Sequence, residues 1–363
     1  MKFEADYIET NIALTQSQLM LWMGQKLNPN SPMYNMAHSF EINGVIDEAV
    51  FKKSFQDLID SVDVFRITFK EEKGIPFQNI LMSFNYDMPI EAISNSNEKA
   101  LDDILQNRTM QLIDVSQPLF DSILYKLDDT RYVWFLNMHH LVTDATSSTI
   151  LFENFTKIYK QNLEAQNDVK FEIPQYRDYL KFEKSIAEDR NKDDIRNYWR
   201  STANKVTAPP ILYGENSKNI TSSSNRVTVK LGEHRISKLE ELASKPEIRC
   251  WTKDLTYFNI FLTSLFIYIK RISNEEKLAI GALSHSRVTN EFKKTAGMFV
   301  ELFPLVAEFS EGDTFLTLYN KVRNETNDYL RHAQPGMASA EASSGFNVVL
   351  NYIKSSFSDF NGS

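Results

Sequence analysis

Apolar residues recur at two distinct spacings along the first half of the chain. Over 48–59 they fall every three to four positions, which predicts an amphipathic helix. The segment 62–69 is rich in β-branched and aromatic residues and predicts a strand. A nearly continuous apolar run over 132–137 predicts a strand buried on both faces. The pattern beyond it predicts a helix that begins near Thr146, with a Ser or Thr as its cap.

The second half alternates in the same way, with a helix predicted over 255–272 and a short strand over 278–283. Strands and helices that alternate indicate α/β or α+β architecture rather than a bundle or a sandwich. A chain of 363 residues exceeds one ordinary domain. Because a polar stretch separates the halves, we expect an N-terminal lobe over 1–165 and a C-terminal lobe over 166–363.

Composition narrows the classes of partner. Hydrophobic residues make up 42% and charged residues 24%, which suits a globular chain with a sizeable core. The 40 basic and 48 acidic residues give a net charge of -8, which argues against binding nucleic acid. No signal-peptide pattern and no apolar run of about 20 residues is present, so we expect no membrane association. The single cysteine, Cys250, favours a reducing cytoplasm.

Two adjacent histidines and an aspartate, His139, His140 and Asp144, follow the predicted buried strand. Neighbouring side chains on an extended backbone point to opposite faces, so one histidine can face a substrate while the other supports the loop. A carboxylate near an imidazole can set its tautomer, and the group permits acid–base chemistry. A chance arrangement remains open on these residues alone. A metal site is disfavoured because zinc enzymes use two histidines at i, i+4 on one helical face.

A family resemblance accompanies these residues. The segment His139-His140-Leu141-Val142-Thr143-Asp144-Ala145 resembles the His-His-x-x-x-Asp-Gly motif of the condensation domains of nonribosomal peptide synthetases, whose fold is similar to chloramphenicol acetyltransferase. Further segments resemble the family's signatures in the same order, from the N-terminus almost to the end: 14–18, 21–22, 28–35, 65–69, 176–179, 198–199, 280–281 with Arg287, 297–300, 303–304, 331–334 and 346–352.

The resemblance implies two chloramphenicol acetyltransferase-like lobes in a V shape with a central tunnel. His140 would meet the reacting nucleophile, while His139 and Asp144 hold the loop. In the family the aspartate pairs with an arginine, and Arg66 is the matching candidate here. The candidates for the wall of the tunnel are Trp22, Ser147, Gly297 and Glu301.

The implied reaction is amide formation between an acyl or peptidyl thioester donor and an aminoacyl acceptor. Both would be carried on phosphopantetheine arms of carrier proteins, with an adenylation domain as a further partner. The domain itself would bind no cofactor and no metal. Two alternatives stay open: a related acyltransferase that forms esters with an alcohol acceptor, and a non-catalytic domain that binds carrier proteins.

The sequence departs from the family pattern at Ala145, at Ser61 and Val62, at Glu301 and at the end of the chain. Ala145 stands where glycine is usual, and its methyl group matters if that backbone adopts positive φ or approaches a substrate closely. We therefore expect Ala145 to affect the support of the site and to lower or alter activity. The chain also ends at Ser363, soon after the Asn351-Tyr352 signature, so we expect an incomplete C-terminal lobe.

Overall fold

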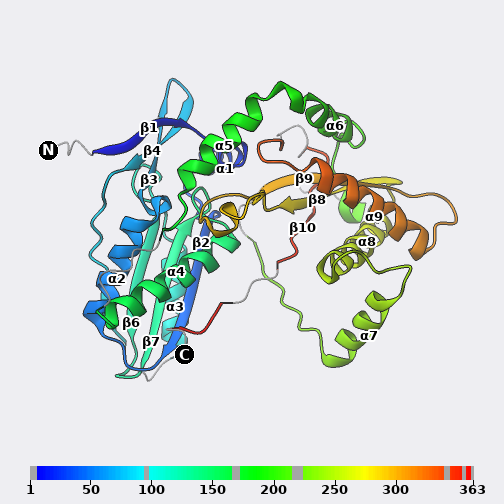
Figure 1. The fold of residues 1–363 in the computed structure, drawn as a ribbon. Helices are drawn as coiled ribbons and strands as arrows, with labels where there is room; N and C mark the ends of the chain where they lie inside the picture. Colours follow the sequence, from blue (N-terminus) through cyan, green and yellow to red (C-terminus); the bar gives the residue numbers. More distant parts are fainter. Residues whose placement is uncertain are drawn as a thin grey trace. The chain divides into compact units, whose positions relative to one another are not determined.

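The computed structural model of the chain describes residues 6–93, 98–165, 172–214, 224–338, 344–353 and 357–360. The chain divides into two compact units that each contain helices and strands, which confirms the predicted mixed α/β class (Figure 1). The first unit comprises Met1–Ser185, Arg287–Phe299 and Ile353–Ser363, and the second comprises Ile186–Ser286 and Val300–Tyr352. Within the described ranges, no helix is both long and apolar enough to traverse a membrane.

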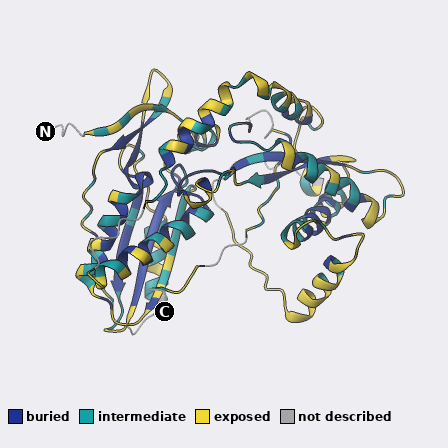
Figure 2. Ribbon diagram, in the orientation of Figure 1, coloured by how far each residue is buried: buried dark blue, intermediate teal, exposed yellow. Residues whose placement is uncertain are grey.

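The larger sheet of the first unit has its strands in the order β2-β7-β6-β5. The strands are β2 (Asn35–Asn43), β5 (Ile90–Ala92), β6 (Phe120–Lys126) and β7 (Arg131–His139). β7 pairs antiparallel with both β2 and β6, and every residue after Arg131 in β7 is buried (Figure 2). This interior place explains why β7 is a continuous apolar run instead of an alternating pattern, as predicted.

Helices cover both faces of this sheet (Figure 1). They are α2 (Glu48–Ser61), α4 (Ala145–Leu163) and α3 (Glu98–Thr109). On the face of α2 and α4, the ring of Phe155 lies 4.3 Å from that of Trp134, centroid to centroid. On the opposite face, Leu105 of α3 packs against a cluster that contains Phe135. Large buried aromatics on one side and a mixed aromatic and aliphatic cluster on the other anchor β7, and with it the segment that follows.

A smaller sheet of the first unit has the order β1-β4-β3. Its strands and the adjoining helix are β1 (Tyr7–Ala13), α1 (Gln16–Leu27), β3 (Ile67–Glu72) and β4 (Ile75–Leu81). The predicted strand over 62–69 is therefore wrong in its first half, where Asp63–Arg66 form a 3-10 turn. Both charged side chains of this turn are buried and bind backbone groups of other segments, contacts that β-branched and aromatic content does not report.

The second unit holds a sheet with the order β10-β8-β9. Its elements are α6 (Asp193–Ala203), α7 (Glu233–Ser244), α8 (Lys253–Ser273), β8 (Lys277–Ser284), β9 (Glu301–Glu308), α9 (Phe315–His332) and β10 (Val349–Leu350). α8 and α9 pack on each other, with Ile260 and Tyr319 in one buried cluster. The helix and strand predicted for this half, at α8 and β8, are confirmed.

The predicted boundary between residues 165 and 166 differs from this division. The helix α5 (Tyr176–Glu188) begins with two backbone N–H groups, of Tyr176 and Arg177, which donate to the buried carboxylate of Asp63 at 2.9 and 3.0 Å. These hydrogen bonds attach the start of α5 to the first unit, which extends through Ser185. Two later segments also belong to that unit, a feature that no local composition change announces.

Candidate active site

The two histidines lie where β7 ends and α4 is about to begin. His139 is the last residue of β7, and Asp144 is the N-cap of α4. The backbone N–H of His139 donates to Leu119 O at 3.0 Å, and that of His140 donates to Tyr34 O at 2.8 Å. The predicted strand-to-helix connection is thus held at its first two residues by neighbouring segments.

His139 is a buried, neutral imidazole. It is 2% exposed, and both of its ring nitrogens have partners. Nε2 lies 3.2 Å from Gln25 Oε1, and Nδ1 accepts the N–H of Leu141 at 3.1 Å. Burial, and secondarily the adjacent His140, lowers the pKa of His139 to about 4. With no free nitrogen, His139 supports the turn and does not itself have a lone pair for a substrate.

His140 has the complementary arrangement. Its Nδ1 lies 2.6 Å from Thr143 O, and because a carbonyl oxygen only accepts, Nδ1 carries the proton. The opposite nitrogen, Nε2, then has a lone pair, and the side chain is partly exposed, unlike that of His139. An imidazole with one nitrogen fixed as a donor and the other left as an acceptor suits general-base chemistry or the holding of an amine.

Asp144 is a fully engaged buried carboxylate. It accepts the N–H of Ser147 at 2.8 Å and the N–H of Phe299 at 3.1 Å, and Ser147 Oγ lies 2.8 Å from it, with one hydroxyl proton that Asp144 shares with Gly297 O. Arg287 donates to both of its oxygens, at 2.8 and 2.9 Å. Burial alone would raise the pKa of Asp144, but Arg287 and Ser147 together hold it below its usual value. Asp144 therefore stays ionised and joins α4 to the segment 287–299.

The predicted pairing of Asp144 with Arg66 is wrong. Arg66 donates instead to four backbone carbonyls, those of Ile59 (3.1 Å), Asp60 (3.1 Å), Leu81 (3.1 Å) and Met82 (2.8 Å). Two of these carbonyls belong to the last turn of α2, where a cation is favourable. Arg66 thus supports the end of α2, whereas Arg287, which lies in one of the segments that resemble the family, is the partner of Asp144.

Ser147 and Gly297 form a buried junction where the sequence suggested a wall of the tunnel. Ser147 is 0% exposed, and its Oγ lies 2.6 Å from Gly297 O and 2.8 Å from Gly297 N. A Cβ on Gly297 would come within 2.0 Å of the Tyr176 ring, so only glycine fits. Hydroxyl and backbone groups that are already paired and enclosed are poorly placed to contact a substrate.

Glu301 and Ala145 also differ from expectation. Glu301, in the second unit, is 2% exposed, and its carboxylate accepts Ser286 Oγ and the N–H groups of Gly336 and Ala338 at 2.9 to 3.0 Å. Burial raises its pKa to about 7. The carboxylate of Glu301 holds the backbone at Gly336 and Ala338, and both of its oxygens already have hydrogen-bond partners. Ala145 is the first residue of α4 and does not have positive φ, so its methyl group causes no backbone strain.

Trp22 lies beside a cavity of about 450 Å³ in the first unit. Its ring stacks on Phe69 at 6.1 Å, and it is 8% exposed. Most of the other lining residues are apolar, while Gln25, which binds His139, also lines the cavity. The position is compatible with a contribution to substrate binding, and that role for Trp22 stays a prediction.

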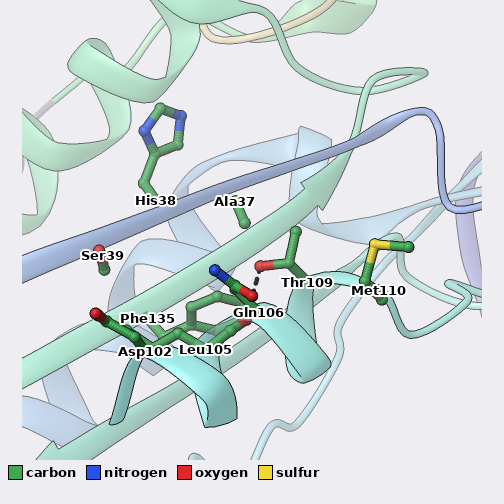
Figure 3. A pocket seen from close by; sticks show the side chains of 9 residues that line it. All are labelled: Ala37, His38, Ser39, Asp102, Leu105, Gln106, Thr109, Met110 and Phe135. Carbon is green, nitrogen blue, oxygen red and sulfur yellow. Dashed lines mark hydrogen bonds between the residues drawn. The ribbon is translucent and has the colours of Figure 1, made fainter. Parts of the chain in front are cut away.

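A second cavity, of about 540 Å³, lies between α3 and the strands β2 and β7 (Figure 3). Leu105 and Phe135 supply apolar surface, and Gln106 supplies a polar group. The ring of His38 points away from the side chains of α3 and stacks on Phe40, centroid to centroid 6.0 Å. Neither histidine of the motif lines this cavity. In the part of the chain that the structure describes, no group of three or more His, Cys, Asp or Glu side chains is arranged to hold a metal ion.

Comparison with known proteins shows which family and which proteins the sequence resembles. The sequence model of the family described as Condensation domain matches residues 8–340. Surfactin synthase subunit 1 of Bacillus subtilis (strain 168) is 27% identical over 304 residues, covering 82% of this chain and 8% of that protein. Tyrocidine synthase 2 of Brevibacillus parabrevis is 21% identical over 324 residues, covering 88% of this chain and 9% of that protein. The chain spans less than about a tenth of these relatives.

Solved structures share the fold. A starter condensation domain of rhizomide synthetase in complex with C8-CoA matches with a TM-score of 0.80 at 21% identity, covering 94% of this chain and 77% of that chain. The first condensation domain of the calcium-dependent antibiotic synthetase, in complex with a substrate analogue, matches at 0.79 and 16%, covering 96% and 82%. The X-domain in complex with OxyB from teicoplanin biosynthesis matches at 0.79 and 17%, covering 91% and 72%.

Proposed function

Because the family model covers most of its length, the chain belongs to the condensation-domain family, and we propose that it catalyses amide bond formation as an acyltransferase. The donor is an acyl or peptidyl thioester, and the acceptor is an aminoacyl group. Both are tethered to the phosphopantetheine arms of carrier proteins, and an adenylation domain that loads them is a further partner. The domain itself contributes side chains and no cofactor. The single cysteine, Cys250, is compatible with a cytoplasmic setting.

The observation that carries this proposal is the protonation pattern of His140. Thr143 O accepts the Nδ1 proton, so Nε2 has a lone pair in the neutral ring. Both ring nitrogens of the neighbouring His139 are hydrogen-bonded, to Gln25 and to Leu141. With its pKa lowered to about 4, the ring is neutral above that pH. One histidine is thus left to act, and its orientation is fixed before any substrate arrives, which favours catalysis.

In the proposed step, the acceptor amine attacks the carbonyl carbon of the donor thioester. A C–N bond forms, the C–S bond breaks, and the acyl chain passes to the acceptor. The proton that the amine loses moves to Nε2 of His140 and then to the departing thiolate, which leaves as a thiol. The same lone pair also serves if His140 only holds the amine and stabilises the charged tetrahedral intermediate.

The test supplies the full chain with acyl-loaded donor carrier protein and aminoacyl-loaded acceptor carrier protein, and measures products by mass spectrometry. Wild type should form the amide. The variant His140→Ala should be slower by about 10²- to 10⁴-fold, the range expected for loss of a general base. The exposed His234→Ala is the matched control and should retain wild-type turnover. Equal turnover by wild type and His140→Ala would refute the assignment of His140.

Two other functions are distinguished by the same assay. An ester-forming relative would use the same lone pair with an alcohol acceptor, so a panel of amines and alcohols identifies it by product mass. A non-catalytic role is suggested by the likeness of fold to an X-domain that is seen in complex with OxyB. In that case wild type makes no product, and His140→Ala binds loaded carrier protein as well as wild type does.

A further inference from the structure

We propose that Gln25 is a positioning residue for this reaction, one that selects the tautomer of His139 and so holds the turn that presents His140. The inference rests on the proposed function, because it assigns Gln25 a part in the same site. Gln25 lies on α1, far from the histidine motif in sequence, and its side chain reaches the end of β7.

The orientation of the Gln25 amide follows from its three partners. Its nitrogen donates to Asn28 O at 3.1 Å and to Ser31 O at 3.2 Å, so both amide hydrogens are used. The amide oxygen must then face the His139 ring, where Nε2 lies 3.2 Å away. Because an amide oxygen only accepts, Nε2 carries the ring proton. The loop that follows α1, through Gln25, therefore favours protonation of His139 at Nε2.

The consequence appears on the other side of the ring. With the proton on Nε2, Nδ1 of His139 is an acceptor and receives the N–H of Leu141 at 3.1 Å. A second bond, from Val142 N–H to His139 O at 3.0 Å, closes the same turn. In the other tautomer, Nδ1–H and the Leu141 N–H would face each other, and the turn beside His140 would lose its side-chain support.

The surroundings of His139 keep its ring neutral. The proposed role of Gln25 requires this, because only a neutral imidazole has two tautomers to choose between. Among the residues that the structure describes, the titratable groups beside its ring include the adjacent His140 and Tyr34, whose ring centroid lies 5.9 Å away. Nearby charges are paired among themselves: Arg108 with Asp121 at 2.6 Å, and Lys26, next to Gln25, with Glu71 at 2.7 Å. The pKa of His139 is lowered to about 4, chiefly by burial. The ring therefore keeps one proton over the working range of pH.

Two substitutions separate this role from simple packing. Gln25→Met keeps the length of the side chain but removes the acceptor, so the His139 tautomers should mix. Gln25→Glu keeps an acceptor for Nε2–H and places a negative charge beside it, which should raise the pKa of His139 by about 1 to 3 units. Gln25→Glu also loses the donors to Asn28 and Ser31. The exposed Gln117→Glu is the control for the change of charge.

The experiment has two readouts on the full chain. In ¹⁵N imidazole NMR, His139 should be the Nε2–H tautomer in wild type and in Gln25→Glu at pH 8, and a mixture in Gln25→Met. In turnover, Gln25→Met should lower kcat by about 10-fold at every pH, in keeping with partial misplacement of the reacting group. The kcat of Gln25→Glu should approach that of wild type at pH 8. As pH falls, it should decrease because His139 becomes cationic, and the same decrease should occur in wild type only at lower pH.

The readouts fail in different ways. Wild type that makes no product counts against the proposed function. It leaves the inference about Gln25 testable, because the NMR measurement needs no substrate. A His139 that stays the pure Nε2–H tautomer in Gln25→Met, or a Gln25→Glu whose acid limb coincides with that of Gln117→Glu, overturns the inference. If Gln25→Met does not fold, Gln25→Glu alone still decides it through the pKa of His139 and the acid limb.

Discussion

Removal of Arg287 is the most direct test of how the site is held together. The variant Arg287→Met keeps much of the aliphatic volume and removes the guanidinium, which is enclosed with Asp144: the side chains are 5% and 1% exposed. It deletes two hydrogen bonds to Asp144, one to Ser147 Oγ at 2.9 Å, and the contact of the guanidinium with the Phe299 ring at 4.1 Å. Asp144 would remain as a buried charge without a counter-ion.

The expected loss of stability follows from the hydrogen bonds that Asp144 keeps in the variant. Loss of one partner of a buried ion pair typically costs about 3 to 5 kcal/mol. Asp144 would keep two backbone donors, the N–H groups of Ser147 and Phe299, and the Ser147 hydroxyl, whose one proton is shared with Gly297 O, so the lower end, about 3 kcal/mol, is expected at pH 7. In wild type the lowered pKa of Asp144 contributes stability that is present above the pKa of the unfolded chain and is lost as pH falls. The cost should therefore shrink towards pH 4.

The assay is urea unfolding at pH 7 and pH 4.5, followed by tryptophan fluorescence in a Trp199→Phe, Trp251→Phe background. Only Trp22 and Trp134, which both belong to the first unit, then report. A double-mutant cycle of Arg287→Met with Asp144→Asn isolates the interaction, and the matched cycle replaces Arg66. We expect strong coupling with Arg287 and less than about 0.5 kcal/mol with Arg66, which shares no partner with Asp144. The reverse result would refute the reasoning.

Further predictions concern packing and pH. Gly297→Ala should destabilise the chain by about 1 to 3 kcal/mol through overlap with Tyr176, whereas Gly232→Ala, with open space around it, should stay within about 0.5 kcal/mol in urea unfolding. Glu301 has a raised pKa of about 7 in the fold, so its contribution is fully present at low pH and is lost as pH rises towards 7. The thermal stability of wild type should therefore exceed that of Glu301→Gln most clearly near pH 5, and the gap should narrow by pH 8. A constant gap would contradict this.

Local pattern was enough to place the histidine pair. The apolar run of β7 predicted an interior strand, and the periodic residues after it predicted a helix, so His139 and His140 were expected at their junction, where the structure has them. The cap of α4 was wrongly expected to be Ser or Thr, although Asp144 was available and its carboxylate receives the N–H of Ser147. The residue at which a helix begins depends on its capping hydrogen bond, and the spacing of apolar residues does not reveal that bond.

What the amino-acid sequence determined by itself was therefore the type of the most strongly patterned elements, the motif at the end of β7 and the segments that resemble the family signatures. Only the tertiary structure decided the partners: Arg287 for Asp144, Gln25 for His139, and the backbone carbonyls at the end of α2 for Arg66. The physical reason is that helix and strand patterns arise from neighbours a few positions apart. A buried charge or imidazole binds whichever complementary group the packing of distant segments brings within about 3 Å, and any arginine or glutamine in the sequence is an equal candidate until the chain has folded.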